Sequence, residues 1–212
     1  MLYLGFKYAT TMNKDIIQED LQRMSEAKLP WRELEGKTVL VTGATGMLAS
    51  YVTWLLLHLH EHAGISVSVV ALCRNRQRAE QYFGSYVGKS YFSLLIQDVC
   101  EPITYEGKVD YVFHLAGNAS PHFINTDPVG IMKCNLLGTI NVLEMARHHA
   151  AKRVLFASTR EVYGKKDAAN SKGYCAYRRI ALDTSKLETL GWSPQISLKE
   201  GLSRTLFNLR SG

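Results

Sequence analysis

The chain has 212 residues, of which 46% are hydrophobic and 21% charged, a composition typical of a folded globular protein and not of a disordered or fibrous one. Its formal charge of +6 comes from scattered lysines and arginines, without the long basic run of a nucleic-acid-binding surface. The N-terminus shows no signal-peptide pattern, and the apolar run at 51–59 is too short to span a bilayer. We therefore expect a cytoplasmic protein that binds neither nucleic acid nor membrane, and whose charge suits a small anionic ligand.

Predicted strands alternate with predicted helices from residue 38 onward. An amphipathic helix over 13–28 comes first and is expected to pack on the main domain. Short β-branched or apolar runs then predict five strands, at 38–41, 66–72, 91–96, 109–114 and 152–157. The helix after the first strand is expected to bury a row that starts at Leu48. Near-continuous apolar strands joined by helices indicate an α/β fold, a doubly wound parallel sheet covered on both faces.

The later helices carry recognisable ends. Asp127 and Pro128 predict the start of a long helix whose apolar residues include Leu136 and Leu143. After a polar stretch, a short helix is expected to stop at Gly191, and a terminal helix is expected to begin at Ser197. These changes divide the chain into an N-terminal helical extension over 1–36, a nucleotide-binding domain over 37–165 and a C-terminal segment of a substrate domain over 166–212.

Cysteine and histidine spacing gives no sign of a disulfide framework or a metal site. The four cysteines (Cys73, Cys100, Cys134 and Cys175) include no CxxC pair, so we expect buried free thiols in a reducing compartment. His58 and His62 stand one helical turn apart, but a polar helix end is the favoured interpretation. We predict no bound metal.

A glycine-rich turn separates the first strand from the first long helix. The turn reads TGATGMLA over 42–49, with glycines at Gly43 and Gly46. Glycine lets the backbone turn sharply and approach a pyrophosphate, whose charge the helix N-terminal N–H groups then meet. A plain tight turn is the alternative, but the position after the first strand of a βαβ unit favours dinucleotide binding.

Five segments, in order, resemble the extended short-chain dehydrogenase/reductases, the NAD-dependent epimerase/dehydratase family that acts on nucleotide sugars. The turn at 42–49 is similar to TGxxGxxG, with Ala49 in place of the third glycine. HLAG at 114–117, the helix NLLGTINVLE at 135–144, STREVYG at 158–164 and the segment LDTSKLETLGW at 182–192 resemble further family motifs. The resemblance implies a Rossmann-like fold with a bound nicotinamide cofactor.

The resemblance also implies which residues contact the cofactor. Asp98 matches the residue that contacts the adenine, and HLAG matches the segment beneath the nicotinamide ribose. The predicted cofactor-binding residues are Gly43, Thr45, Gly46, Met47, Leu48, Arg74, Asn75, Asp98, Val99, Leu115, Ala116, Gly117, Asn135 and Ser158.

The residues after the second strand bear on the choice between NAD and NADP. An acidic residue there holds the ribose of NAD, whereas this chain has Cys73, Arg74, Asn75 and Arg76. Two arginines could hold a 2′-phosphate, so NADP is favoured over NAD. The alternative is a solvated basic helix start.

The resemblance assigns two catalytic positions and leaves two unmatched. Thr159 matches the hydroxyl that binds the C4 oxygen of the sugar, and Glu161 matches the carboxylate of dehydratases and decarboxylases. Dehydratases usually carry Asp between these residues, and Arg160 here departs from that pattern. We find no match for the family's Tyr and Lys, four residues apart, which form the proton acceptor.

The chain passes from the fifth strand directly to the family's C-terminal segment. Either an intervening stretch is missing from this sequence, or the protein is itself shortened. We favour the first, because a deletion would strip the sheet of covering helices.

Together these features predict a nucleotide-sugar epimerase/dehydratase, a lyase or isomerase of carbohydrate biosynthesis. Epimerisation, dehydration and decarboxylation all begin with oxidation at the sugar C4, so the three remain open. The alternative is a non-catalytic NAD(P)-binding paralogue, and a simple alcohol reductase is disfavoured by the segment at 182–192. The expected partners are a nucleotide-sugar substrate and a second copy of the chain in a homodimer.

Overall fold

The computed structural model describes residues 14–118, 121–159 and 184–210. The chain divides into two compact units, one of residues 1–157 together with 208–212, and one of residues 158–207. The elements of the first unit are α1 (Lys14–Ser25), η1 (Trp31–Leu34), β1 (Lys37–Thr42), α2 (Met47–His62), β2 (Val67–Cys73), α3 (Arg76–Phe83), η2 (Gly84–Tyr86), β3 (Phe92–Ile96), β4 (Tyr111–His114), α4 (Pro121–Thr126), α5 (Pro128–His148) and β5 (Arg153–Phe156). Two further helices follow, α6 (Ser185–Glu188) and α7 (Leu198–Arg210).

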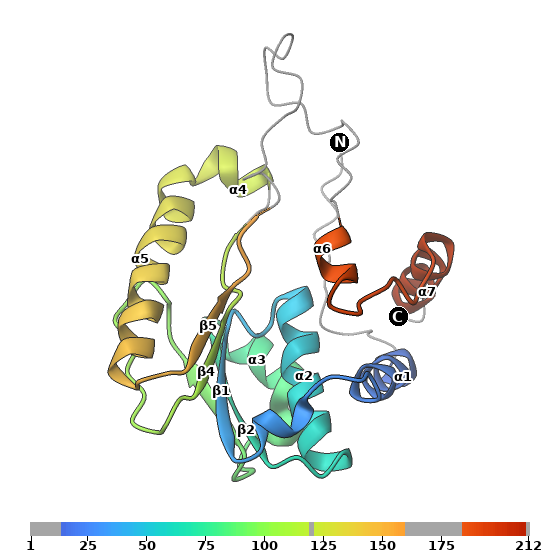
Figure 1. The fold of residues 1–212 in the computed structure, drawn as a ribbon. Helices are drawn as coiled ribbons and strands as arrows, with labels where there is room; N and C mark the ends of the chain where they lie inside the picture. The colour runs from blue at the N-terminus through green and yellow to red at the C-terminus, as the bar shows by residue number, and fades with distance from the viewer. Residues whose placement is uncertain (1–13, 119–120, 160–183, 211–212) are drawn as a thin grey trace. The chain divides into compact units, whose positions relative to one another are not determined.

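The strands form one parallel sheet in the order β3-β2-β1-β4-β5. The chain builds outward from β1 to β2 and β3, then crosses to the other side of β1 to form β4 and β5 (Figure 1). Thr42, the last residue of β1, is in register with Leu72 on one side and His114 on the other. The predicted doubly wound parallel sheet is confirmed, and its switch point lies between β1 and β4.

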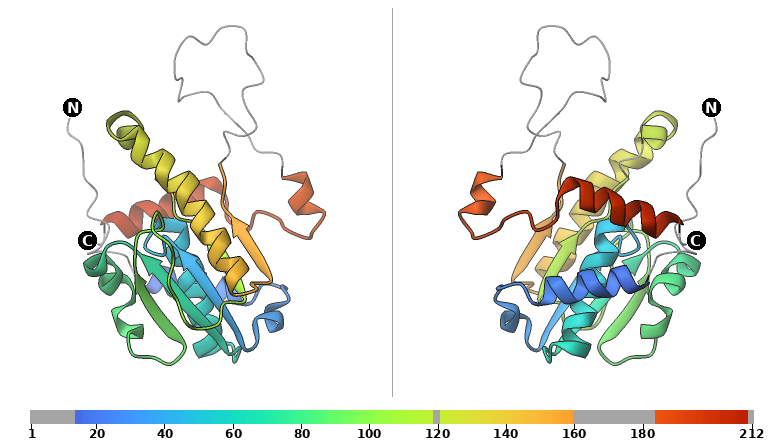
Figure 2. Two further views of the ribbon diagram at one scale, coloured as in Figure 1. Left: turned by 90° about the vertical axis from the view of Figure 1, so that its left-hand side faces the viewer. Right: turned by 90° about the vertical axis from the view of Figure 1, so that its right-hand side faces the viewer.

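Helices cover both faces of the central strands (Figures 1 and 2). Alternate residues of β1 point to opposite sides, so Val39 and Val41 pack in the core beneath α2 and α3. Leu40 points the other way and packs with Val142 and Met145 of α5. The sheet therefore packs in two separate cores, one on each face. The loops at the ends of the strands lie outside these cores and are available to form a site.

The predicted apolar rows of α2 and α5 are buried only in part. Leu48 is 73% exposed, because it lies in the first turn of α2, beyond the end of the sheet. In α5, Leu136 and Leu143 are also exposed, since the helix turns Val142 and Met145 to the sheet instead. This helix carries apolar residues on two opposite faces, and periodicity alone cannot tell which face a sheet will cover.

The N-terminal helix packs on the main domain as predicted, although it ends at Ser25 and not at residue 28. Ile17 and Leu21 are buried, and the Tyr51 hydroxyl of α2 donates to Asp20 at 3.3 Å. Figure 2 shows α1 crossing over α2, with which it is in contact. Within the described residues, none of the helices is both long enough and apolar enough to cross a membrane.

The second unit confirms both predicted helix ends. Gly191 follows α6 with φ at +84°, the left-handed conformation that glycine adopts most readily. The Ser197 hydroxyl accepts the N–H of Glu200 at 3.2 Å and caps α7.

Candidate functional site

The carboxyl ends of the parallel strands bring four predicted cofactor segments to one edge of the sheet. The glycine-rich turn follows β1, Arg74 and Asn75 follow β2, Asp98 and Val99 follow β3, and residues 115–117 follow β4. Ligands of doubly wound sheets bind at this edge, beside the point where the strand order reverses. The structure therefore brings these four segments to one edge of the sheet, and their role in cofactor binding stays a prediction.

Gly43 lies at the switch point, in close contact with the backbone of Ala116. Its φ is +64°, and a Cβ added to it would lie 2.8 Å from the Cα of Ala116. No side chain fits there, so the backbones of the glycine-rich turn and the HLAG segment pack directly against each other. The two segments form one continuous floor at this end of the sheet.

The N-terminus of α2 offers backbone donors beside that floor. Gly46 is the N-cap residue and supplies no side-chain oxygen to cap the first N–H groups. Met47 and Leu48 are exposed, so nothing within the first unit covers this helix end. Free N–H groups at the positive end of a 16-residue helix fit the pyrophosphate of a dinucleotide.

A buried hydroxyl ties the two backbone segments together. Thr42 is fully buried, and its Oγ1 accepts the N–H groups of Leu115 and Ala116, both at 3.1 Å. The same Oγ1 lies 2.8 Å from Nδ1 of His114. Since the hydroxyl already accepts two protons, we assign its own proton to the bond with Nδ1. The sequence places Thr42 at the start of the glycine-rich motif but assigned it no role, because its partners lie far along the chain.

The network continues through His114 into α5. Nε2 of His114 lies 3.2 Å from Oγ1 of Thr139, and the Thr139 hydroxyl donates to the carbonyl of Asn135 at 2.6 Å. Nε2 therefore carries the imidazole proton, and each hydroxyl and ring nitrogen of the chain has a partner. Burial lowers the pKa of His114, which keeps the ring neutral at physiological pH. The predicted residue Asn135 also borders Gly117, whose added Cβ would lie 3.6 Å from Oδ1 of Asn135.

Replacement of Thr42 by valine is expected to destabilise the fold. Valine keeps the shape of threonine but leaves two part-buried N–H groups and Nδ1 of His114 without their partner. We expect the free energy of unfolding to fall by about 1–3 kcal/mol, measured by chemical denaturation. Thr42→Ser retains the hydroxyl and serves as the control. Equal losses in both variants would contradict the assigned network.

Acid is expected to destabilise the protein through His114. The folded-state pKa lies below the unfolded value of 6.5, so the unfolded chain binds more protons as pH falls through 6.5. The contribution of neutral His114 to the free energy of unfolding is therefore fully present above pH 6.5 and declines as the pH falls below that value. His58, whose pKa burial and His62 lower, acts in the same direction. We expect the loss between about pH 7.5 and 5.5 to be smaller in His114→Gln than in the unsubstituted protein; an identical loss would exclude His114 as a source.

Arg74 and Asp98 meet at the end of β2 and β3. Nη1 of Arg74 lies 3.6 Å from Oδ2 of Asp98, and the Cys100 N–H donates to Oδ1 of the same carboxylate at 2.9 Å. Burial by itself would raise the pKa of Asp98, but the Cys100 donors and the Arg74 charge outweigh it and lower the pKa. Asp98 is therefore an ionised, positioned carboxylate, as an adenine-binding residue must be to accept hydrogen bonds.

The basic residues after β2 have separate partners. Arg74 points to Asp98, whereas Arg76 pairs with Glu80 one turn along α3, at 3.6 Å. Asn75 is the N-cap of α3, and its Oδ1 accepts the N–H of Arg78 at 2.8 Å. The Arg78 side chain, which sequence reasoning missed, donates to the carbonyl of Thr45 at 3.1 Å and so supports the glycine-rich turn.

The two predicted catalytic residues and Ser158 belong to the second unit or lie beyond the described part. Ser158 and Thr159 are its first residues and are exposed, and Ser158 has φ at +54°. Glu161 lies outside the described residues, as does Cys175. Their roles stay predictions.

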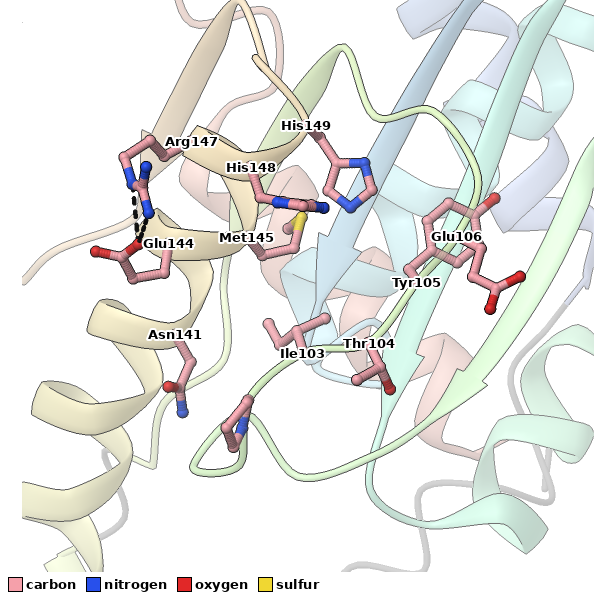
Figure 3. A pocket seen from close by; sticks show the side chains of 11 residues that line it. Ile103, Thr104, Tyr105, Glu106, Asn141, Glu144, Met145, Arg147, His148 and His149 are labelled. Carbon is pink, nitrogen blue, oxygen red and sulfur yellow. Dashed lines mark hydrogen bonds and ion pairs between the residues drawn. The ribbon is translucent and has the colours of Figure 1, made fainter.

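A hollow of about 480 Å³ lies apart from the cofactor segments (Figure 3). It is bordered by 102–106 and the C-terminal half of α5, where Nε and Nη2 of Arg147 both donate to Oε2 of Glu144. None of the predicted site residues lines it. We therefore place the candidate site at the carboxyl edge of the sheet and not in this hollow.

The described residues give no sign of a metal centre. The rings of His58 and His62 lie 4.7 Å apart between centroids, yet within the described ranges no group of three or more potential ligands forms. Cys73, Cys100 and Cys134 are free thiols, but only Cys73 is fully buried, so the expectation of burial is wrong for the other two.

The sequence pattern that accompanies this geometry decides the family. A model of the NAD dependent epimerase/dehydratase family matches residues 39–184, more than half of the chain. The chain belongs to this family. The match spans the glycine-rich turn, the HLAG segment and α5. In the structure of this family member, these three segments lie together.

Curated relatives and solved structures agree with this membership. UDP-glucuronic acid decarboxylase 1 of Xenopus tropicalis is 34% identical over 151 residues, which are 69% of this chain and 34% of the relative. UDP-glucuronic acid decarboxylase 6 of Arabidopsis thaliana is 34% identical over 126 residues, 59% of this chain and 34% of the relative. The chain thus spans about a third of the length of these curated relatives.

Two solved structures share the fold. DesIV, a dTDP-glucose 4,6-dehydratase from Streptomyces venezuelae, matches with a TM-score of 0.52 and 22% identity, over 63% of this chain and 43% of its own. The epimerase Mth375 from Methanothermobacter thermautotrophicus matches with a TM-score of 0.51 and 25% identity, over 61% of this chain and 37% of its own. The expected Rossmann-like fold is confirmed.

Proposed function

We propose that the carboxyl edge of the sheet binds a nicotinamide dinucleotide, with NADP preferred over NAD. The observation that carries the proposal is the close approach of Gly43 to Ala116 beside the uncapped N-terminus of α2. The N–H groups of that helix would hold the pyrophosphate, Asp98 the adenine, and Arg74 the 2′-phosphate. The nicotinamide supplies a hydride acceptor.

Calorimetry with the purified chain tests the binding. We expect both dinucleotides to bind, and NADP to bind more tightly, because a phosphate near Arg74 gains a charge-assisted bond. Equal affinities would remove the basis for the preference, and no binding of either would overturn the proposal.

We further propose that the function is the transformation of a nucleotide sugar, beginning with oxidation at C4. Family membership supports this class of reaction, and the curated relatives are named UDP-glucuronic acid decarboxylases. UDP-glucuronic acid is therefore the first substrate to assay, followed by other UDP- and dTDP-sugars. Release of carbon dioxide identifies decarboxylation, whereas an epimer or a dehydrated sugar identifies the other two outcomes.

A specific observation favours a second candidate, a non-catalytic NAD(P)-binding protein. No Tyr and Lys four residues apart follow STREVYG in the chain, so the proton acceptor expected at the sugar C4 hydroxyl has no match. Cofactor binding without turnover of any nucleotide sugar would support this candidate. Turnover would exclude it, and would direct mutagenesis to Tyr163 and Tyr174 as replacement bases.

We also propose that the protein acts in the cytoplasm as a homodimer joined through α5. Exposed apolar side chains form one stripe on this helix, at Val129, Met132, Leu136, Ile140 and Leu143. The opposite face of α5 already packs on the sheet, so the stripe remains for a second copy. We expect light scattering to give a dimer mass that falls to that of a monomer in Ile140→Lys. The exposed Lys133→Glu serves as the control, and a monomer before substitution would contradict the proposal.

A further inference from the structure

One buried ring lies between two of the segments that are predicted to contact the dinucleotide. His114 is the last residue of β4 and is 1% exposed, and the chain continues from it directly into residues 115–117. On the other side of the ring is α5, where Asn135 lies one helical turn before Thr139. Asn135 and Gly117 are both exposed, as residues that contact a ligand must be. The proposed function assigns neither His114 nor Thr139 a role.

The two ring nitrogens of His114 make different hydrogen bonds. In the assigned tautomer, Nδ1 accepts from the Thr42 hydroxyl of β1 at 2.8 Å, and Nε2 donates to Oγ1 of Thr139 at 3.2 Å. Thr139 in turn donates to the carbonyl of Asn135 at 2.6 Å. Because an imidazole ring is rigid, its two bonds together fix the separation between the end of β1 and this part of α5.

The Nε2 bond acts on the part of α5 that carries Asn135. A Cβ added to Gly117 would lie 3.6 Å from Oδ1 of Asn135, so this amide lies close to the backbone of the segment after β4. Further along the helix, Val142 and Met145 pack in the core between α5 and the sheet. That core does not depend on His114. Removal of the Nε2 bond should therefore shift the part of α5 around Asn135 without releasing the helix from the sheet.

We propose that His114 is a positioning residue of the dinucleotide site, which holds Asn135 beside Gly117 through its bond to Thr139. The inference deepens the proposed function and rests on it. The buried ring acts through Asn135 and not by contact with the dinucleotide. It pre-organises the site, because a ligand that must first draw the helix into place binds less tightly. Loss of one such hydrogen bond should weaken binding about 2- to 12-fold.

Two substitutions of His114 separate its two bonds. Glutamine can place an amide N–H at the position of Nε2, so His114→Gln keeps the bond to Thr139 and loses the bond to Thr42. Asparagine can place an amide oxygen at the position of Nδ1, so His114→Asn keeps the bond to Thr42 and loses the bond to Thr139.

Calorimetry with NAD compares these two variants. We expect His114→Gln to bind NAD nearly as tightly as the unsubstituted protein, and His114→Asn to bind it about 2- to 12-fold more weakly. Each variant loses one hydrogen bond of the ring, so a merely structural role predicts equal effects. Equal affinities of the two variants, or a larger loss in His114→Gln, would overturn the proposal.

Substitutions of Thr139 test the same bond from its other end. Thr139→Val removes the hydroxyl and should weaken NAD binding as much as His114→Asn, whereas Thr139→Ser should retain the affinity. The double variant of His114→Asn and Thr139→Val should lose no more than either single variant, because both remove one bond. Additive losses would show that the two residues act separately, and would contradict the proposal.

Thr53→Val is the matched control for Thr139→Val. Thr53 of α2 also donates to the carbonyl four residues before it, that of Ala49, at 2.8 Å. The control therefore removes the same kind of hydroxyl from a helix, away from His114. It should leave the NAD affinity unchanged. An equal loss in Thr53→Val and Thr139→Val would assign the effect to general destabilisation and overturn the proposal.

A spectroscopic measurement tests the assigned bond without a ligand. Nitrogen chemical shifts of the isotope-labelled protein distinguish a protonated ring nitrogen from an unprotonated one, and the signals that disappear in His114→Gln belong to His114. We expect its proton on Nε2 at neutral pH. A proton on Nδ1 would overturn the proposal, since Nε2 could not then donate to Thr139.

The unsubstituted protein separates failure of the inference from failure of the proposed function. If it binds neither NAD nor NADP, the proposed function is overturned and the inference with it. If it binds NAD but the two His114 variants do not differ from each other, the inference alone is overturned.

Discussion

Replacement of Gly43 by alanine is expected to abolish dinucleotide binding. The residue has φ at +64°, and a Cβ would lie 2.8 Å from the Cα of Ala116. Because the N–H of Ala116 donates to the Thr42 hydroxyl, Ala116 cannot move without loss of a part-buried hydrogen bond. The glycine-rich turn must shift instead, and the N-terminus of α2 shifts with it. We expect calorimetry to detect no binding of either dinucleotide.

Gly36 provides a matched control for this experiment. It has nearly the same φ, +63°, but an added Cβ would meet nothing within 4 Å. Gly36→Ala therefore carries only the conformational penalty of a left-handed residue, about 1–2 kcal/mol in the free energy of unfolding. Dinucleotide binding should survive in Gly36→Ala. If Gly43→Ala were to bind as well as its control, the direct contact between the two backbones would not matter for the site.

Replacement of Arg74 by alanine is expected to weaken the binding of NADP and not of NAD. A lost hydrogen bond to a charged group costs about 1.5–3 kcal/mol, or about 10- to 150-fold in affinity. The Arg74 side chain is 72% exposed, so solvent screening places the effect near the lower end of that range. We expect NADP affinity to fall about tenfold at low salt and by less at high salt.

Arg76→Ala is the matched control, since it removes the same charge two residues away. The guanidinium of Arg76 pairs with Glu80 along α3 and not with Asp98. It should therefore change NADP affinity much less than Arg74→Ala. Equal effects of both substitutions would assign the preference to the general positive charge of this helix start. Loss of NAD binding in Arg74→Ala would show that the arginine acts by holding Asp98.

Local patterns in the sequence determined most of the fold. The central strands are short, mostly apolar runs, and this pattern occurs where a strand is covered on both faces. The expected covering fails at the edge strand β5, where Leu155 and Phe156 are exposed. Helix ends at Asp127, Gly191 and Ser197 are set by residues within one turn of the chain, so each of them was predicted. The glycine-rich turn was found for the same reason, because its conformation depends on glycines a few residues apart.

The tertiary structure decided which of these local features meet. The Thr42 hydroxyl contacts residues more than 70 positions away, and Arg74 reaches Asp98 because strand order places β3 beside β2. Gly138 lets α5 approach Val99, since an added Cβ would lie 2.9 Å from Cγ2 of Val99. Strand order and register set these contacts, and neither is encoded within a single element. For the same reason, the residue pattern of α5 has two apolar faces, and only the packed sheet shows which face it covers.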